Sequence, residues 1–104
     1  MPPADHSTDY AAERVATDRR LTDAMAAAQG GDRAAYELVL RECVPVVRRI
    51  ARAQGADANI LDDVVQDVLI TLHGARATFD PSRSFVAWLT AITQRRAIDI
   101  LRKR

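Results

Sequence analysis

The sequence has a single cysteine, Cys43, so no disulfide bond can form within the chain and nothing indicates an oxidising compartment. It also lacks any run that approaches the ~18 consecutive apolar residues of a membrane-spanning helix. The first residues, MPPADHSTDYAAERVATDRR, have neither the basic start nor the apolar run of a secretory signal. These absences predict a soluble, cytoplasmic protein without a membrane partner. Cys43 itself falls at an apolar helical position, where we expect a buried, unreactive thiol.

Residue patterns that carry catalysis or bind cofactors are missing as well. There is no glycine-rich phosphate loop, no pair of cysteines or histidines at metal-ligand spacing, and no serine, histidine and acid set that helices would bring together. The carboxylates of residues 59–73 have a simpler explanation than cation binding, because acids in the first turn of a helix favour the positive end of its dipole. The sequence therefore predicts neither an enzyme nor a protein with a metal or another cofactor.

Alternation of apolar and polar residues with a period of two, which marks a half-buried strand, is also absent. Apolar residues recur instead at helical spacing in four segments. With 104 residues, the chain is long enough for one domain with a modest core. We therefore predict an all-α fold, a compact bundle of four helices over residues 17–104, preceded by a flexible lead-in over residues 1–16. The predicted helices are 17–29, 33–54, 59–73 and 84–104.

Several of these helices have clear boundary signals. Asp32 directly precedes the second helix and is a good N-cap, and Gly55 ends that helix. Pro45 interrupts the same helix and removes a backbone hydrogen bond, so we expect a kink near residues 41–45. Residues 74–84 form a linker in which Asp-Pro-Ser is typical of a turn, and Ser84 is placed to cap the last helix.

The third helix has a wide apolar face and an outward row of mostly polar residues. The outward row consists of Asp63, Gln66, Asp67 and Ile70. Because Gln66 and Asp67 point away from the apolar face, we expect substitutions there to leave the fold intact. Ile70 is weak evidence of a contact surface, since single exposed apolar residues are ordinary.

The last helix has two halves of different character. Its first half places Phe85, Trp88 and Leu89 on one face, where we expect core packing, including for Trp88. Its second half is basic around a single acid, Asp99, which an intrahelical ion pair accounts for. Such a helix fits a polyanion, although a solvated C-terminal turn favoured by the helix dipole fits the composition equally well. The cations of this half are Arg95, Arg96, Arg102, Lys103 and Arg104.

The net charge of +1 conceals a separation of charge along the chain. Residues 57–80 contain five aspartates and one arginine, whereas residues 83–104 contain six cationic residues and one aspartate. Blocks of opposite sign indicate two surfaces for two partners, or two surfaces that pair with each other.

Several motifs, taken in order, resemble conserved region 2 of bacterial sigma factors of the small extracytoplasmic-function group. GDRAAYELVLRECVPVVRRIA resembles the opening Gly-Asp helix of that family, and LDDVVQDVL is similar to its acidic helix that docks on the polymerase clamp. FDPSRSFVAWLTAI resembles the loop and helix start used for promoter melting, and RRAIDILRKR the start of the helix that meets the −10 promoter element. The resemblance covers residues 18–104.

The resemblance implies a domain that docks on core RNA polymerase and that recognises and melts the −10 element without a cofactor. The implied partners are core polymerase, the melted non-template strand of promoter DNA and an anti-sigma factor. The polymerase-binding residues would be Asp63, Gln66, Asp67 and Ile70. The DNA-binding residues would be Phe79, Asp80, Ser82, Arg83, Ser84, Arg95, Ile98, Arg102 and Lys103.

The sequence departs from the family pattern at a few positions. His73 stands where the family commonly has an aromatic residue, and Arg95 where an asparagine is frequent, so the base preference does not follow from the resemblance. The chain stops where the family would continue to a second helical domain, and we expect a fragment. The alternative from the residues alone is a helical protein-binding module whose basic helix meets an acidic protein partner without binding DNA.

Overall fold

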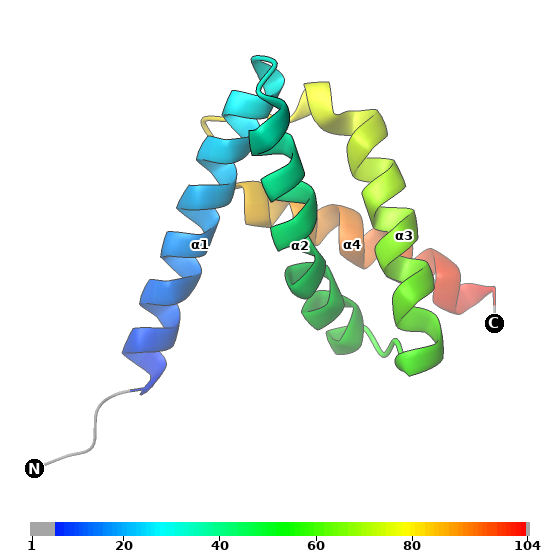
Figure 1. Ribbon diagram of the computed structural model, residues 1–104. Helices are drawn as coiled ribbons and strands as arrows, with labels where there is room; N and C mark the ends of the chain where they lie inside the picture. Colours follow the sequence, from blue (N-terminus) through cyan, green and yellow to red (C-terminus); the bar gives the residue numbers. More distant parts are fainter. Residues whose placement is uncertain (1–5, 104) are drawn as a thin grey trace, which may run out of the picture.

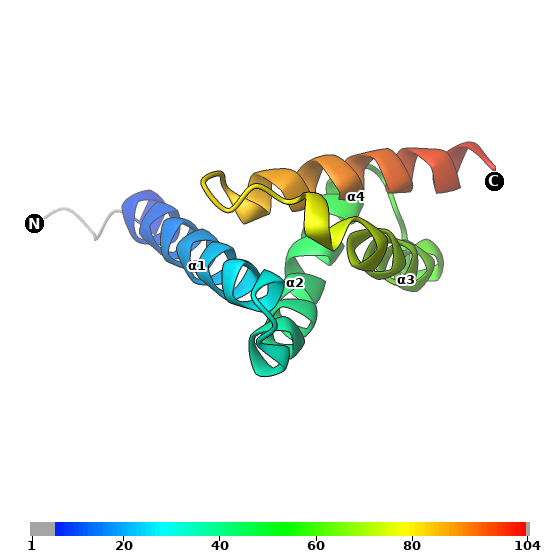
Figure 2. The same cartoon turned by 90° about the horizontal axis from the view of Figure 1, so that it is seen from above.

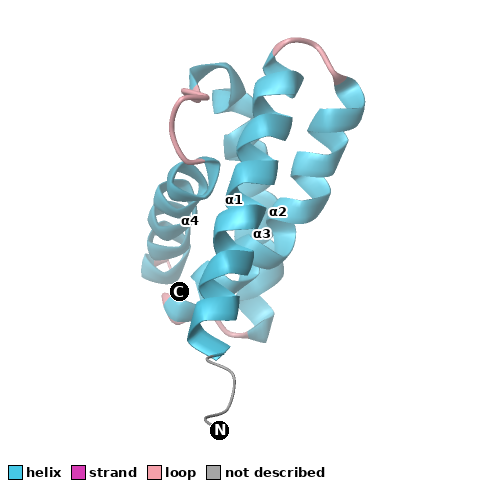
Figure 3. Ribbon diagram, turned by 90° about the vertical axis from the view of Figure 1, so that its left-hand side faces the viewer, coloured by secondary structure: helices cyan, strands magenta, loops and turns pink. Residues whose placement is uncertain are grey.

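The computed structural model describes residues 6–103, which form four helices joined by short loops (Figure 1). In chain order these are α1 (His6–Gln29), α2 (Arg33–Ala53), α3 (Ala58–Ala75) and α4 (Phe85–Arg102), with a short 3₁₀ helix, η1 (Arg76–Thr78), directly after α3. Figure 3 shows helices and loops and no strand in this part of the chain. The predicted all-α fold of four helices is confirmed.

Helix α2 is the central element, because it packs against α1, α3 and α4. Helix α4 crosses behind α2 instead of running alongside it (Figure 1), and the view from above shows α4 along one side of the molecule with α2 running toward it (Figure 2). Helix α4 also packs against α1 and α3. One face of α4 is therefore buried against three helices, and the opposite face is open to solvent.

The core is built from apolar side chains of all four helices. Its largest fully buried members are Phe85 and Leu89 of α4, Leu21 and Met25 of α1, and Leu72 of α3. Full burial of a side chain of this size contributes about 1.5–3 kcal/mol relative to leaving it exposed. None of the helices within residues 6–103 combines the length and apolar character that a membrane crossing requires.

Cys43 lies in this core and is shielded from solvent. Its Sγ donates to the carbonyl oxygen of Leu40 at 3.5 Å, and burial raises the pKa of the thiol to about 11. The predicted burial is confirmed, and the reactive thiolate form is scarce at neutral pH.

Helix α1 begins at His6, so the prediction of a lead-in up to residue 16 is wrong for residues 6–16, which are helical. Hydrophobic periodicity missed this half of the helix because every side chain from Tyr10 to Ala16 is exposed. The helix is favoured here by alanines with high helical propensity and by a local contact, with Arg14 lying 4.8 Å above the ring of Tyr10. Residues 1–5 of the predicted lead-in lie outside the described part.

The start of α2 agrees with its sequence signal. Asp32 is the N-cap, and its Oδ1 accepts a hydrogen bond from the N–H of Ala35 at 3.0 Å. The helix continues through Pro45 to Ala53 and is followed by Gly55, whose φ of +102° favours glycine. The kink near Pro45 stays a prediction.

The start of α3 differs from the predicted one. Asp57 is the N-cap, and its Oδ1 accepts from the N–H groups of Asn59 at 2.9 Å and Ile60 at 3.2 Å. The first turn contains no acid, so the dipole explanation for the carboxylates that follow is wrong. One of them, Asp62, instead pairs with Arg48 of α2 at 3.1 Å.

Candidate functional site

The start of α4 is held in place by side chains from α1. The N–H of Phe85 donates to Oγ1 of Thr22 at 3.0 Å, and the N–H of Val86 donates to Oδ1 of Asp18 at 2.9 Å. Ser84 is the N-cap as predicted, its Oγ accepting from the N–H of the third residue of the helix at 3.0 Å. Side chains thus satisfy the first three free N–H groups of α4, which fixes the helix relative to α1.

Next to this helix start lies a hollow of about 600 Å³, formed by the loop that precedes α4 and the first turn of α4. Phe79, predicted to bind DNA, is only 3% exposed, and its ring packs in the core. The ring still lines the hollow from the core side, so a contact of Phe79 with DNA stays a prediction and would have to be made inside the hollow. The hollow is lined by Thr78, Phe79, Asp80, Arg83, Ser84, Ala87 and Trp88.

Three aromatic rings make up the apolar side of the hollow and the core behind it. The ring of Phe79 lies edge-on to that of Phe85, with centroids 5.5 Å apart, and 5.3 Å from that of Trp88. Phe85 and Trp88 are 5.7 Å apart. Trp88 is partly buried against the core, which confirms its predicted packing, and the rest of it lines the hollow.

The polar side of the hollow is a turn built on Asp80. Its Oδ1 accepts from the backbone N–H of Ser82 at 2.9 Å and from Ser82 Oγ at 2.7 Å, as the Asp-Pro-Ser sequence indicates. These hydrogen bonds, with a weaker contribution from the guanidinium of Arg83, hold the pKa of Asp80 below its ordinary value. The turn leaves Arg83 exposed beside the hollow, with its Nε 3.6 Å from Asp80 Oδ2.

A glutamine from α1 fixes the far side of this loop. The side-chain nitrogen of Gln29 donates to the carbonyl oxygens of Arg76 at 2.9 Å and Phe79 at 2.8 Å. Sequence patterns missed Gln29, Asp18 and Thr22, because their partners lie 47 to 68 residues further along the chain. No local signal marks such interactions.

Beyond the hollow, the solvent-facing side of α4 carries cations and one aliphatic residue. Arg95, Ile98 and Arg102 lie on this side and are exposed, Ile98 by 40%. Among the described residues, neither Arg95 nor Arg102 has an ion-pair partner. Lys103 is also exposed and is the C-cap of the helix. The structure thus groups the predicted DNA-binding residues of α4 in one row that leads away from the hollow.

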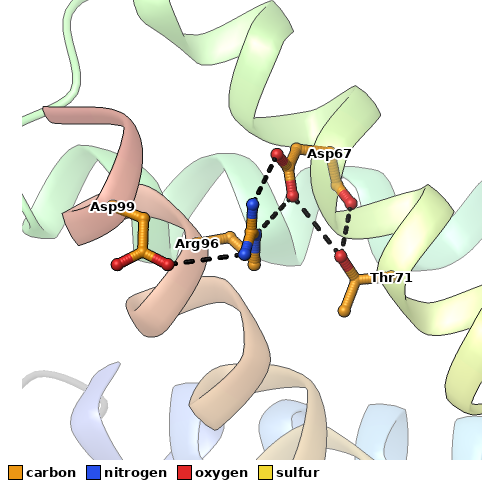
Figure 4. A network of polar contacts seen from close by, with 4 residues as sticks. All are labelled: Asp67, Thr71, Arg96 and Asp99. Carbon is orange, nitrogen blue, oxygen red and sulfur yellow. Dashed lines mark hydrogen bonds and ion pairs between the residues drawn. The ribbon is translucent and has the colours of Figure 1, made fainter. Parts of the chain in front are cut away.

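Arg96 faces the opposite way and joins α4 to α3 (Figure 4). Its Nε and Nη2 donate to the two carboxylate oxygens of Asp67 at 2.5 and 3.0 Å. Its Nη1 reaches Oδ2 of Asp99 at 3.4 Å, which confirms the predicted intrahelical pair. Thr71 adds a hydrogen bond to the backbone oxygen of Asp67 at 2.9 Å. Asp67 therefore accepts hydrogen bonds from Arg96 of α4 and from Thr71 of its own helix, α3.

The prediction that Asp67 points outward is wrong. Its side chain is 29% exposed and is turned toward α4 by the bidentate contact with Arg96. The hydrogen bonds from Arg96, more than the attraction of its charge, hold the pKa of Asp67 below its ordinary value. Asp67 thus joins α3 to α4, and we expect a substitution there to destabilise the fold, contrary to the expectation from the sequence.

The rest of the predicted docking row lies on the outer face of α3. Asp63, Gln66 and Ile70 are exposed, and Ile70 has 67% of its surface open to solvent. At the end of the same face, the ring Nδ1 of His73 is hydrogen-bonded to the hydroxyl of Tyr36 at 2.7 Å. Within residues 6–103, no group of three or more acids, histidines or cysteines is placed to hold a metal ion.

Comparison with known proteins assigns this architecture to a family. The family model of Sigma-70 region 2 matches residues 39–104. The chain is 34% identical over 93 residues to the ECF RNA polymerase sigma factor SigF of Caulobacter vibrioides. The aligned part covers 85% of this chain and 50% of SigF. It is 40% identical over 78 residues to the RNA polymerase sigma factor CnrH of Cupriavidus metallidurans, covering 75% of this chain and 40% of CnrH.

The fold also matches a solved structure, an engineered region 2 of sigmaE determined by NMR in complex with GTAAAA. The TM-score is 0.67 at 27% sequence identity, with 83% of this chain and 86% of that one covered. The chain spans half the length or less of the curated relatives named above. The family model covers more than half of the chain, and the solved structure has the same fold. The protein therefore belongs to the Sigma-70 region 2 family.

Proposed function

We propose that this chain is a domain of an alternative RNA polymerase sigma factor, which docks on core polymerase and recognises and melts the −10 promoter element. The observation that carries the proposal is the shared fold with a sigma region 2 that was solved with a hexanucleotide, together with a hollow and a cationic row in this chain. In this role the protein acts in the cytoplasm with core polymerase and promoter DNA, and an anti-sigma factor is a further proposed partner.

The hollow beside the start of α4 suits an unstacked base. Extruding a base from a duplex costs a few kcal/mol, and a protein recovers this cost by stacking the base and binding its edge. Here Trp88 and Phe79 supply an apolar floor, while Asp80 and Ser84 supply polar groups at the side. Because Gln29 and the turn at Asp80 fix the loop, the hollow is formed before DNA arrives.

The cationic row on α4 suits the phosphates that flank the captured base. Arg95 and Arg102 are two helical turns apart, exposed and without an ion pair among residues 6–103, so binding phosphate breaks no ion pair of either side chain. Arg83 lies at the other end of the same path. The DNA strand is thus proposed to run from the hollow along the outer face of α4.

Replacing both Arg95 and Arg102 with glutamate is expected to weaken binding of a single-stranded oligonucleotide containing GTAAAA at least tenfold. It should also flatten the dependence of log affinity on log salt by about 0.7 for each phosphate that the protein no longer neutralises. Fluorescence anisotropy between about 50 and 200 mM salt measures both quantities. The control is Arg33→Glu, at an arginine that is also exposed and lies at the start of α2, away from α4. If the variant and the control weaken oligonucleotide binding equally, the proposal that Arg95 and Arg102 of α4 bind DNA is contradicted.

The outer face of α3 is the proposed polymerase-docking surface, now centred on Ile70 and Gln66, with Asp67 behind it as a positioning residue. We expect the combination Gln66→Ala with Ile70→Asp to weaken binding to core polymerase at least tenfold, about 1.4 kcal/mol. Both side chains are exposed, so the free energy of unfolding should change by about 0.5 kcal/mol or less.

The control for this experiment is Ile98→Asp, which introduces the same charge at the exposed aliphatic residue of α4. It should leave polymerase binding unchanged while it weakens DNA binding. Titration of labelled protein with core enzyme measures the affinities. Undiminished affinity of the α3 variant, with an unchanged melting temperature, would remove the docking assignment.

A further inference from the structure

A groove of about 500 Å³ lies on a part of the molecule that the proposed function does not use. It is bounded by the first half of α1, the second half of α2 and the first half of α4. Each helix contributes one row of side chains at helical spacing, so the groove is three-walled and runs along the helices. The residues that determine its character are Tyr10, Arg14, Val46, Arg49, Ile50 and Val86.

The floor of the groove is apolar. Val46 and Ile50 of α2 and Val86 of α4 line it, and all three retain some exposure beside the core. On the open side, α1 separates from α2 toward its N-terminal end, while the two helices are adjacent near the loop that joins them (Figure 1). The volume of the groove, about 500 Å³, leaves room for side chains of a partner above this apolar floor.

The first half of α1 is exposed, whereas the second half of the same helix packs in the core. Every side chain from Tyr10 to Ala16 is exposed, and Tyr10, which lines the groove, is 51% exposed. Helical propensity and the contact of Arg14 with the Tyr10 ring favour this segment as a helix, but without packing they stabilise it only marginally. A partner seated in the groove would supply that packing.

The charges at the groove edge select the kind of partner. Among the described residues neither Arg49 nor Arg14 has an ion-pair partner, and Arg14 lies over the ring of Tyr10. Glu13 is the one carboxylate in the lining, which leaves a surplus of positive charge. Two arginines beside an apolar floor suit carboxylates on a mainly apolar partner. They are too few, and the floor too apolar, for a phosphate backbone.

We propose that this groove binds an amphipathic helix of another protein, one whose apolar face is flanked by carboxylates. The apolar face would rest on Val46, Ile50 and Val86, and the carboxylates would pair with Arg14 and Arg49. This is the helix-in-groove mode of recognition, read by side chains at successive helical turns. The surface is separate from the DNA-binding row of α4 and from the outer face of α3.

The direct test is an NMR titration of the ¹⁵N-labelled chain with two synthetic helical peptides. One carries leucines at i, i+3, i+4 and i+7 with glutamates beside them, and the other has the glutamates replaced by lysines. The acidic peptide should shift the amide signals of Tyr10, Arg14, Arg49 and Ala53, and it should bind at least tenfold more tightly than the basic one. Equal affinities, or shifts confined to other residues, overturn the proposal.

Substitutions then locate the site without disturbing the core. Arg49→Glu should weaken binding of the acidic peptide at least tenfold. Arg41→Glu changes an exposed position on the same helix outside the groove and should change the affinity for this peptide less than twofold. Ala53→Trp fills the groove from an exposed position and should abolish binding. The proposal is overturned if neither groove variant changes the affinity for the acidic peptide. It is also overturned if single-stranded DNA shifts the same amide signals. Neither DNA nor polymerase is needed, so this test and that of the proposed function fail independently.

Discussion

Replacing Phe85 with alanine is expected to lower the free energy of unfolding by about 3–5 kcal/mol. Phe85 is fully buried, and its ring packs against those of Phe79 and Trp88 at the point where the hollow meets the core. Because small domains are stable by only about 5–15 kcal/mol, a loss of this size removes much of the total. Urea denaturation followed by circular dichroism measures it, and the melting temperature should fall by roughly 12 °C or more.

The matched control for Phe85→Ala is Ile98→Ala on the same helix. Ile98 is 40% exposed and faces solvent, so its truncation should change the free energy of unfolding by about 0.5 kcal/mol or less. A Phe85→Ala protein that keeps its full stability would mean that the aromatic cluster does not hold α4 in place. In that case the hollow beside it would have no fixed floor.

Reversing the charge of Asp67 is expected to destabilise the protein by about 2 kcal/mol, the order of a hydrogen bond between charged groups together with the loss of its partner. Asp67→Lys places a cation against Arg96, which the structure holds between two carboxylates. The double variant Asp67→Lys with Arg96→Asp restores opposite charges and should recover at least half of the stability. A double-mutant cycle in urea denaturation isolates this coupling, and additive effects of the two changes would contradict it.

The same pair predicts a dependence on pH. Since Arg96 lowers the pKa of Asp67 in the folded state, the unfolded chain takes up this proton first as the pH falls. The contribution of the carboxylate is therefore fully present above its ordinary pKa of about 3.9 and is lost as the pH falls through the lower folded-state value. The stability difference between the natural protein and Asp67→Asn should narrow below about pH 4.

Features that depend on neighbouring residues could be predicted from the sequence. The caps Asp32 and Ser84, the turn at Asp80 and the burial of Cys43 all follow from local spacing, and each was confirmed. The first half of α1 was missed because it has no buried face to create an apolar period. Its helix comes from propensity, which is a weaker signal than periodicity.

Features that depend on distant parts of the chain could not be predicted. The hydrogen bonds from the start of α4 to Asp18 and Thr22, and those of Gln29 to the loop, join residues far apart in the sequence. The orientation of Asp67 has the same cause, because Arg96 lies 29 residues away and its position depends on how α4 crosses α3. Helical spacing places Asp67 on the outer side of one helix, but it carries no information about a second helix at its edge.

The same oligonucleotide offered as a single strand and as a paired duplex tests the central proposal most directly. Because the hollow is proposed to hold a base that has left the stack, single-stranded GTAAAA should bind at least tenfold more tightly than its duplex, about 1.4 kcal/mol, reflecting the cost of opening. In the NMR spectrum, the single strand should shift the signals of residues 79–84 and of Arg95 and Arg102. Equal or tighter binding of the duplex, or shifts that avoid the hollow, would contradict base capture by this domain.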